Sequence, residues 1–355
     1  MTAPSTRIPV AILGATGAVG QTFVRLLANH PWFEIAELAA SERSAGKPYA
    51  AACQWLEGEM PAHLMDREVA LCDTTSVSSP VVFSALDTAV AGDMEPAFAR
   101  VGAIVLSNAK NFRMEPDIPL VIPEVNASHL DLIARQRANR AWRGAIVTNA
   151  NCAATVATMA LAPLNEAFGL THVVMVTMQA VSGAGYPGVP SLDILGNVIP
   201  YIGDEEPKIE REMNKMLGQM QDHAVVAAKF AVSAHANRVA TEHGHLVCLS
   251  IGLAQKASIE EIIQVLHQWR GSTDALELPS APARALVVTL DPTRPQTRRD
   301  VMAGNGMTVT VGRVRPDPIF DVKLVALGHN TIRGAAGGSV LNAELLVAKG
   351  VIPAS

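Results

Sequence analysis

The sequence predicts an α/β protein with two domains, on three observations. The chain has 355 residues, of which 49% are apolar, so it can bury a core in each of two domains. Near its N-terminus a short apolar stretch, a glycine-rich turn, a helical stretch and a second apolar stretch follow one another. Further apolar stretches alternate with helical ones up to about residue 148, which is typical of a parallel sheet covered by helices.

The N-terminal unit has the order of a Rossmann-type dinucleotide-binding domain. An apolar strand at residues 10–13 runs into a glycine turn at residues 14–20, and a helix is expected over residues 21–29, before Pro31. A second strand is expected over residues 34–40. In this arrangement the turn approaches a pyrophosphate and the helix start donates N–H groups to it. A tight turn that only packs the helix on the sheet is the alternative. The residues expected to contact the dinucleotide are Gly14, Thr16, Gly17, Ala18 and Val19.

The residues after the second strand favour NADP over NAD. A carboxylate at the end of this strand would bind the ribose 2′-hydroxyl of NAD. The chain has Ser41, Arg43 and Ser44 here, which could hold a 2′-phosphate, with Arg43 as the charged donor. Glu42 is the competing interpretation, but we expect it to lie one step beyond the strand end and to point away. A solvated surface arginine is the alternative for Arg43.

A polar, basic loop follows the apolar strand expected at residues 103–107. It contains Asn108, Lys110 and Arg113. Ligands of an open parallel sheet bind beyond the carboxyl ends of its strands. Lys110 and Arg113 are therefore candidates for binding an anionic group of a substrate. Two solvated bases on a surface loop are an equally good interpretation of this segment alone.

Cys152 stands where an apolar strand that starts at residue 145 gives way to a helical stretch. A cysteine at a helix N-terminus meets the positive end of the helix dipole, which favours the thiolate, and a thiolate is a nucleophile at neutral pH. The small residues Ala153 and Ala154 leave the sulfur accessible, which favours this interpretation over a buried structural cysteine. Cys152 is therefore the candidate nucleophile.

Composition excludes several classes of protein. A net charge of −5 gives no basic surface for nucleic acid. No apolar run approaches the length of a membrane span, and the N-terminal residues have no signal-peptide pattern. The four cysteines lie far apart, without C-x-x-C or zinc spacing, so no metal site is expected. These observations predict a soluble cytoplasmic protein with reduced thiols.

Several segments together resemble aspartate-semialdehyde dehydrogenase. They are the glycine turn, Asn151-Cys152-Ala153 and residues 107–113, 119–126, 179–188, 237–245 and 330–338. The likeness extends from about residue 10 to residue 348 and is strongest to the archaeal and fungal branch. It implies NADPH-dependent reduction of β-aspartyl phosphate to aspartate semialdehyde, with release of phosphate, through a cysteine thioester. This reaction belongs to the pathway from aspartate to lysine, threonine and methionine.

The resemblance also implies how the chain is divided. Residues 1–148 would form the NADP-binding domain, completed by a C-terminal helix within residues 330–355. Residues 149–329 would form an α+β catalytic and dimerisation domain. Members of the family are dimers or tetramers, so a homodimer or homotetramer is expected.

The resemblance assigns the reacting groups. Cys152 would be the nucleophile and His245 the general acid and base that handles protons on the tetrahedral oxygen and the sulfur. On a strand, His243 would share a face with His245, so the sequence alone does not decide between these two histidines.

The resemblance also assigns the residues that bind the substrate. Arg238 would clamp the α-carboxylate and Glu205 would bind the ammonium group, with Glu206 as the rival of Glu205. Arg113 and Lys208 would hold the phosphate. Further residues implied in substrate binding are Asn108, Lys110 and Gln179, and further ones in cofactor binding are Ser182, Gly183 and Asn342.

Two other functions fit parts of this pattern. One is an acyl-CoA reductase of the malonyl-CoA type on the same scaffold. The presence of Glu205, Arg238 and Arg113 argues against it, because a CoA thioester has no ammonium group to pair with Glu205. The other is an NADP-binding protein without catalytic activity, which would have no need of both Cys152 and His245.

Overall fold

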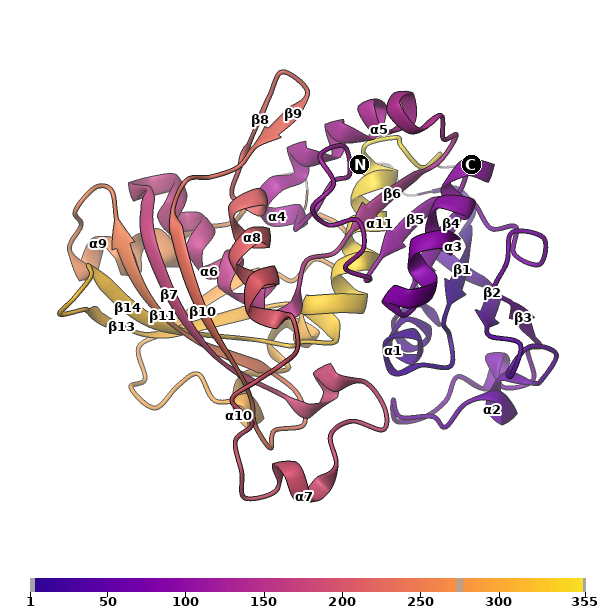
Figure 1. The fold of residues 1–355 in the computed structure, drawn as a ribbon, viewed down its shortest axis with the longest axis horizontal. Helices are drawn as coiled ribbons and strands as arrows, with labels where there is room; N and C mark the ends of the chain where they lie inside the picture. The colour runs from indigo at the N-terminus through magenta and orange to yellow at the C-terminus, as the bar shows by residue number, and fades with distance from the viewer. Residues whose placement is uncertain (1–3, 273–274, 276, 354–355) are drawn as a thin grey trace.

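Two six-stranded β-sheets organise the chain, and they lie side by side in Figure 1. This computed structural model describes residues 4–272, 275 and 277–353. One sheet is built from the N-terminal part of the chain, and the other from strands that follow the long helix α6 (Cys152–Phe168). The predicted fold class, a Rossmann-type domain with an α+β domain, is confirmed.

The N-terminal sheet is parallel throughout, in the order β3-β2-β1-β4-β5-β6. Its strands are continuous apolar runs because helices cover both faces of such a sheet. The strand order reverses between β1 and β4, and ligands of open α/β sheets bind beyond the strand ends at this point. The strands are β1 (Ile8–Leu13), β2 (Phe33–Ala40), β3 (Val69–Leu71), β4 (Val81–Ser84), β5 (Ile104–Ser107) and β6 (Ala145–Thr148).

The helix after β1 starts earlier than predicted. Helix α1 (Ala18–Leu27) begins three residues before the expected position, because the extended Gly17 (φ −82°, ψ 166°) is its N-cap. The buried residues of α1 belong to the same hydrophobic core as those of α11 (Gly337–Ala348). Helix α3 (Thr88–Val101) contributes to a second hydrophobic core of the same sheet. A π-helical turn, Ile332–Ala336, leads into α11, which contacts α1 and β5. The last helix thus returns to the N-terminal sheet.

The second sheet is mixed, in the order β10-β7-β11-β14-β13-β12. Helix α6 packs on β7, β11, β13 and β14, with α8 (Glu205–Met216) against β10 and α9 (Ile259–Gln268) against β12 and β13. The other face carries Val174, Val176 and Met178 of β7, which are partly exposed. The strands are β7 (Leu170–Gln179), β10 (Ala231–Arg238), β11 (His245–Leu253), β12 (Leu286–Thr289), β13 (Val309–Pro316) and β14 (Val322–Gly328).

Among the residues that the structure describes, no helix has the length and apolar character needed to cross a membrane.

Shorter elements connect these layers. The connecting elements are α2 (Tyr49–Ala52), α4 (Pro123–Asn126), α5 (Leu132–Arg140), α7 (Ser191–Ile194), α10 (Thr297–Asp300) and the hairpin of β8 (Gln219–Gln221) and β9 (Ala224–Val226).

Candidate active site

A cleft of about 470 Å³ brings together most of the predicted site residues. Its walls come from the loop after β5, the start of α6, the end of β7, the first turn of α8 and the end of β10. These segments are far apart in the sequence, and some follow strands of the N-terminal sheet while others adjoin the second sheet. The predicted residues that line the cleft are Val19, Asn108, Lys110, Arg113, Cys152, Gln179, Ser182, Gly183, Glu205, Lys208 and Arg238.

Cys152 is the first residue of α6, and the side chain of Asn151 caps this helix. The Asn151 side-chain oxygen accepts hydrogen bonds from the backbone N–H groups of Ala153 and Ala154, each at 3.0 Å. Sγ of Cys152 lies 3.1 Å from Nε2 of His245, the first residue of β11. The predicted nucleophile and the predicted acid and base are thus within hydrogen-bond distance.

Two glycines let the backbone approach this pair. A Cβ at Gly334 would lie 2.7 Å from the Cβ of Cys152. A Cβ at Gly183 would lie 3.2 Å from Cε1 of His245 and 3.0 Å from Nη1 of Arg238. Arg238 is buried, and its Nη1 donates to the carbonyl oxygen of Ala180 over 2.8 Å. The reacting groups are therefore enclosed by backbone on two sides.

The backbone also sets the tautomer of His245. The N–H group of Ala180 donates to Nδ1 of this ring over 3.2 Å. A neutral ring must then carry its proton on Nε2, the nitrogen that faces Sγ of Cys152. His245 is thus a hydrogen-bond donor to the sulfur in the free protein.

The surroundings keep both members of the pair neutral. Burial and then the charge of Glu205 raise the pKa of Cys152 to about 12, although Arg113 and Arg238 act in the opposite sense. Burial, followed by the charge of Arg238, lowers the pKa of His245 to about 3. The expectation of a thiolate is wrong for the free protein, because burial and Glu205 raise the pKa of the sulfur more than Arg113 and Arg238 lower it.

Alkylation of Cys152 by iodoacetamide should therefore accelerate steadily with pH. With a pKa of about 12, its thiolate fraction rises about tenfold per unit between about pH 7 and 10, whereas an ordinary thiol levels off above about pH 9. Peptide mass spectrometry of the Cys152 peptide measures the rate. A plateau below about pH 9 would contradict the effect assigned to burial.

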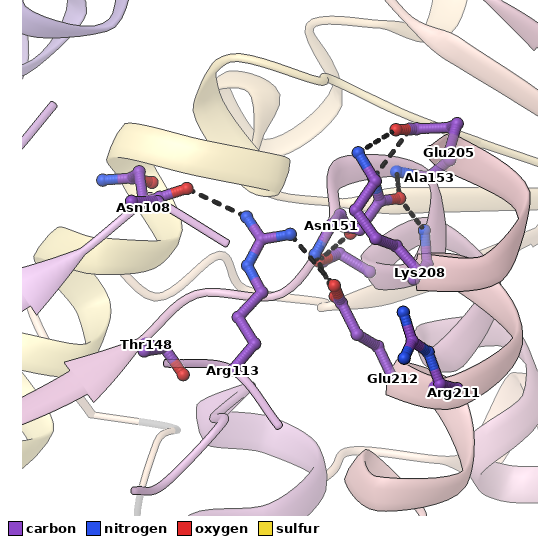
Figure 2. Close-up of polar contacts among 12 residues, drawn as sticks. Asn108, Arg113, Thr148, Asn151, Ala153, Glu205, Lys208, Arg211 and Glu212 are labelled. Atoms are coloured by element: carbon purple, nitrogen blue, oxygen red, sulfur yellow. Dashed lines mark hydrogen bonds and ion pairs between the residues drawn. The ribbon is translucent and has the colours of Figure 1, made fainter. Parts of the chain in front are cut away.

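Glu205 and Lys208 form an ion pair in the first turn of α8, with 2.8 Å between Oε2 and Nζ (Figure 2). The other carboxylate oxygen of Glu205 accepts from Nδ2 of Asn151 at 2.7 Å and from Nε2 of Gln179 at 3.2 Å. Burial raises the pKa of Glu205, but the ammonium of Lys208 and these hydrogen bonds bring the pKa below its usual range. The cleft thus contains an ionised carboxylate.

The two rival residues have other partners. The carboxylate of Glu206 accepts from the backbone N–H of Ala236 on β10 at 2.9 Å. His243 lies in the loop between β10 and β11, so it does not share a strand face with His245 as expected. Nδ1 of His243 lies 3.1 Å from Oγ of Ser182, and its ring stacks on that of His329 with 4.9 Å between centroids.

Arg113 has a guanidinium group that is held at two of its nitrogens, as Figure 2 shows. Nη1 lies 3.0 Å from Oε1 of Glu212, and Nη2 donates to the carbonyl oxygen of Asn108 over 2.9 Å. Its Nε is buried without a partner among the described residues. Lys110 lies at the exposed rim of the cleft, and its Nζ is 2.9 Å from Oδ2 of Asp204. Arg113 therefore keeps donors for an anion.

The turn after β1 fits the backbone of a dinucleotide. Gly14 has φ +72°, and a Cβ there would lie 2.6 Å from the carbonyl oxygen of Ala85, so only glycine fits. Helix α1 begins without a side-chain cap, which leaves N–H groups of its first turn for a pyrophosphate. In the turn after β2, Ser41 and Arg43 are exposed and Ser44 is buried. Thr16 and Gly17 follow Gly14 in the turn after β1, and Ala18 is the first residue of α1. The next residue, Val19, lines the cleft.

Asn342 is not brought to the cleft. It is buried in α11, where its amide donates to the carbonyl oxygen of Val121 and to Oδ1 of Asn149. Sequence reasoning also missed Asn330, whose amide donates to Oγ of Ser182 at 2.8 Å and whose oxygen accepts from the N–H of Gly244 at 2.9 Å. The position of Asn330 at the start of a recognised segment was the available signal.

Comparisons with known proteins agree with this geometry. A semialdehyde dehydrogenase NAD-binding domain model matches residues 9–133, and a semialdehyde dehydrogenase dimerisation domain model matches residues 161–333. The second match indicates that the protein forms an oligomer.

The relatives cover nearly the whole chain. The chain is 46% identical to aspartate-semialdehyde dehydrogenase of Archaeoglobus fulgidus, over 98% of this chain and 100% of that protein. It is 47% identical to the enzyme of that name from Schizosaccharomyces pombe, over 97% and 99% of the two chains. The crystal structure of aspartate semialdehyde dehydrogenase with NADP from Candida albicans superposes with a TM-score of 0.89, at 40% identity over 98% and 100% of the chains. The resemblance to the archaeal and fungal branch is confirmed, and the chain belongs to the aspartate-semialdehyde dehydrogenase family.

Proposed function

We propose that this protein catalyses the NADPH-dependent reduction of β-aspartyl phosphate to aspartate semialdehyde, with release of phosphate. The observation that carries the proposal is the contact of 3.1 Å between Cys152 and His245 inside the cleft. A nucleophile in this position can form a covalent acyl intermediate. The names of the relatives support the same reaction.

Three charged groups of this substrate match charged groups of the cleft. The ionised Glu205 is suited to the ammonium group, and the planar Arg238 to two-bond binding of the α-carboxylate. Arg113 and Lys208 are suited to the phosphate. Asn108, Lys110 and Gln179 lie around these groups in the same cleft.

Cys152 and His245 then have separate roles in the reaction. Sγ of Cys152 attacks the acyl carbon, the bond from that carbon to the phosphate oxygen breaks, and the thiol proton leaves as part of hydrogen phosphate. The product on the enzyme is a thioester. Nε2–H of His245 donates a hydrogen bond to the sulfur while charge develops on it, both in the attack and when the carbon–sulfur bond later breaks, and solvent supplies the proton that restores the thiol.

The backbone N–H of Cys152 is the candidate donor to the substrate oxyanion. The N–H groups on either side of it are already engaged, since that of Asn151 donates to Glu212 and those of Ala153 and Ala154 donate to the Asn151 side chain. One N–H group at the start of a helix, aimed at the developing charge, stabilises the transition state.

NADPH, when bound, supplies the hydride that reduces the thioester. The glycine turn and the start of α1 would hold its pyrophosphate, and the turn after β2 its 2′-phosphate. Asn342 is left out of this set because its amide is engaged within the core. The residues proposed to contact NADP are Gly14, Thr16, Gly17, Ala18, Val19, Ser41, Arg43, Ser44, Ser182 and Gly183.

The alternatives fit the cleft less well. A malonyl-CoA-type substrate has no ammonium group that could bind to the ionised carboxylate of Glu205. A protein that only binds NADP has no use for a cysteine in the cleft in contact with a buried histidine.

We further propose which part of the chain binds NADP and which part carries the catalytic residues. Residues 1–148, completed by the helix within 330–355, bind NADP, and residues 149–329 supply the chemistry. The partly exposed sheet face with Val174, Val176 and Met178 is a suitable surface for a homodimer or homotetramer. The cytoplasmic location stays a prediction.

Absorbance of NADPH tests the reaction directly. Purified protein is mixed with aspartate semialdehyde, phosphate and NADP, and NADPH formation that depends on phosphate is the expected result. No signal in this mixture, together with NADPH consumption in the presence of malonyl-CoA, would replace the proposal by the acyl-CoA reductase.

A further inference from the structure

Helix α8 carries the spacing Glu-x-x-Lys twice. The first pair is Glu205 and Lys208, and the second is Glu212 and Lys215, seven residues further on. Seven residues are close to two helical turns, so the two pairs project from the same side of α8. The first pair lines the cleft, whereas the carboxylate of the second pair lies behind Arg113.

Glu212 connects two parts of the active site. It is 1% exposed, and Figure 2 shows it pointing toward Arg113. One carboxylate oxygen lies 3.0 Å from Nη1 of Arg113, in the loop after β5. The other accepts from the backbone N–H of Asn151, the residue that precedes Cys152 and caps α6, at 2.5 Å. A single side chain thus joins the proposed phosphate-binding arginine to the start of the nucleophile's helix.

Lys215 holds the same loop by its backbone. Its Nζ donates to the carbonyl oxygens of Arg113 at 2.7 Å, Glu115 at 2.7 Å and Ile118 at 2.8 Å. Lys215 is also buried. Lys215 therefore fixes the backbone of Arg113, while Glu212 fixes its side chain.

We propose that Glu212 is a positioning residue for the phosphate end of the substrate, an inference that rests on the proposed function. With Nη1 on Glu212 and Nη2 on the Asn108 carbonyl oxygen, the guanidinium has one orientation, in which Arg113 lines the cleft. Charge-assisted hydrogen bonds to a planar guanidinium depend on that orientation. Glu212 acts through Arg113 and Asn151, without touching the substrate.

The variant Glu212→Gln tests this role in steady-state kinetics. An amide accepts from one of the two donors and presents its own N–H group to the other, so the link between Arg113 and Asn151 breaks. We expect KM for phosphate to rise about tenfold, as for loss of one charge-assisted hydrogen bond, with KM for NADP changed less than about twofold. Glu210→Gln is the matched control, because Glu210 lies on α8 but its carboxylate accepts from the backbone N–H of Ala234 on β10. Equal phosphate KM values in all three proteins would overturn the proposal.

A second readout does not need turnover. Inorganic phosphate should slow alkylation of Cys152, and Glu212→Gln should need about ten times more phosphate for the same protection. Equal protection of the variant and the natural protein overturns the positioning role. Alkylation of the natural protein that phosphate does not slow argues against phosphate binding in this cleft, and the proposed function then fails together with the inference. Glu212→Asp, which shortens the arm by one methylene, gives the same comparison if the glutamine variant does not fold.

Discussion

Replacing Cys152 with serine should lower kcat by about 10⁴-fold or more, because a covalent step that needs a thiol is lost. The hydroxyl of serine is far less acidic, and the ring of His245 is a weak base, with a pKa of about 3. Nothing in the pair can then activate the hydroxyl. NADP binding should be unchanged, since the glycine turn after β1 lies outside the substituted helix start.

Phosphate-dependent formation of NADPH measures kcat, and titration calorimetry measures NADP binding. Cys248→Ser is the matched control, because Cys248 is a half-buried thiol on β11 with a raised pKa and no place in the cleft. The control should keep its activity. Activity of Cys152→Ser within about tenfold of the natural protein would exclude the covalent mechanism.

Features with a strong local signal could be predicted from the sequence. The parallel sheet follows from buried apolar strands, and the position of Cys152 at a helix start follows from the change of pattern at residues 148–152. Asn151 is a preferred N-cap residue, so the start of α6 is also set locally. The predicted start of α1 was three residues too late, because the N-cap is Gly17, which has no side chain to mark the position.

Other features depend on contacts between distant segments. Glu212 meets Arg113 across 99 residues of chain, and Lys215 meets the carbonyl oxygens of the same loop. A polar helix face gives no sign of such partners, because solvated acidic and basic residues have the same spacing. The protonation of Cys152 belongs to this group too, since burial by other segments decides its pKa.

Replacing His245 with glutamine should lower kcat by about 10²–10³-fold, the usual effect of losing a hydrogen-bond donor to a developing charge, whereas His243→Gln should change it less than about threefold. The difference follows from placement. Nε2 of His245 faces Sγ of Cys152, but His243 is in a loop, where its Nδ1 faces Oγ of Ser182. Measuring both variants by the NADPH assay decides between the two histidines, and a larger loss in His243→Gln would reverse the assignment.

The pH profile of the natural protein gives an independent check of His245. Because burial and Arg238 hold its pKa near about 3, the ring is neutral at every pH above about 5. Protonation of His245 therefore contributes no loss of kcat/KM between about pH 8 and pH 5, the range in which an ordinary histidine would contribute one. An acidic limb near about pH 6 that disappears in His245→Gln would show that the ring titrates normally and that its buried, Nε2-protonated state is wrong. A profile without that limb, together with the loss of kcat in the variant, would support a neutral histidine that works by donating a hydrogen bond from Nε2–H to the sulfur.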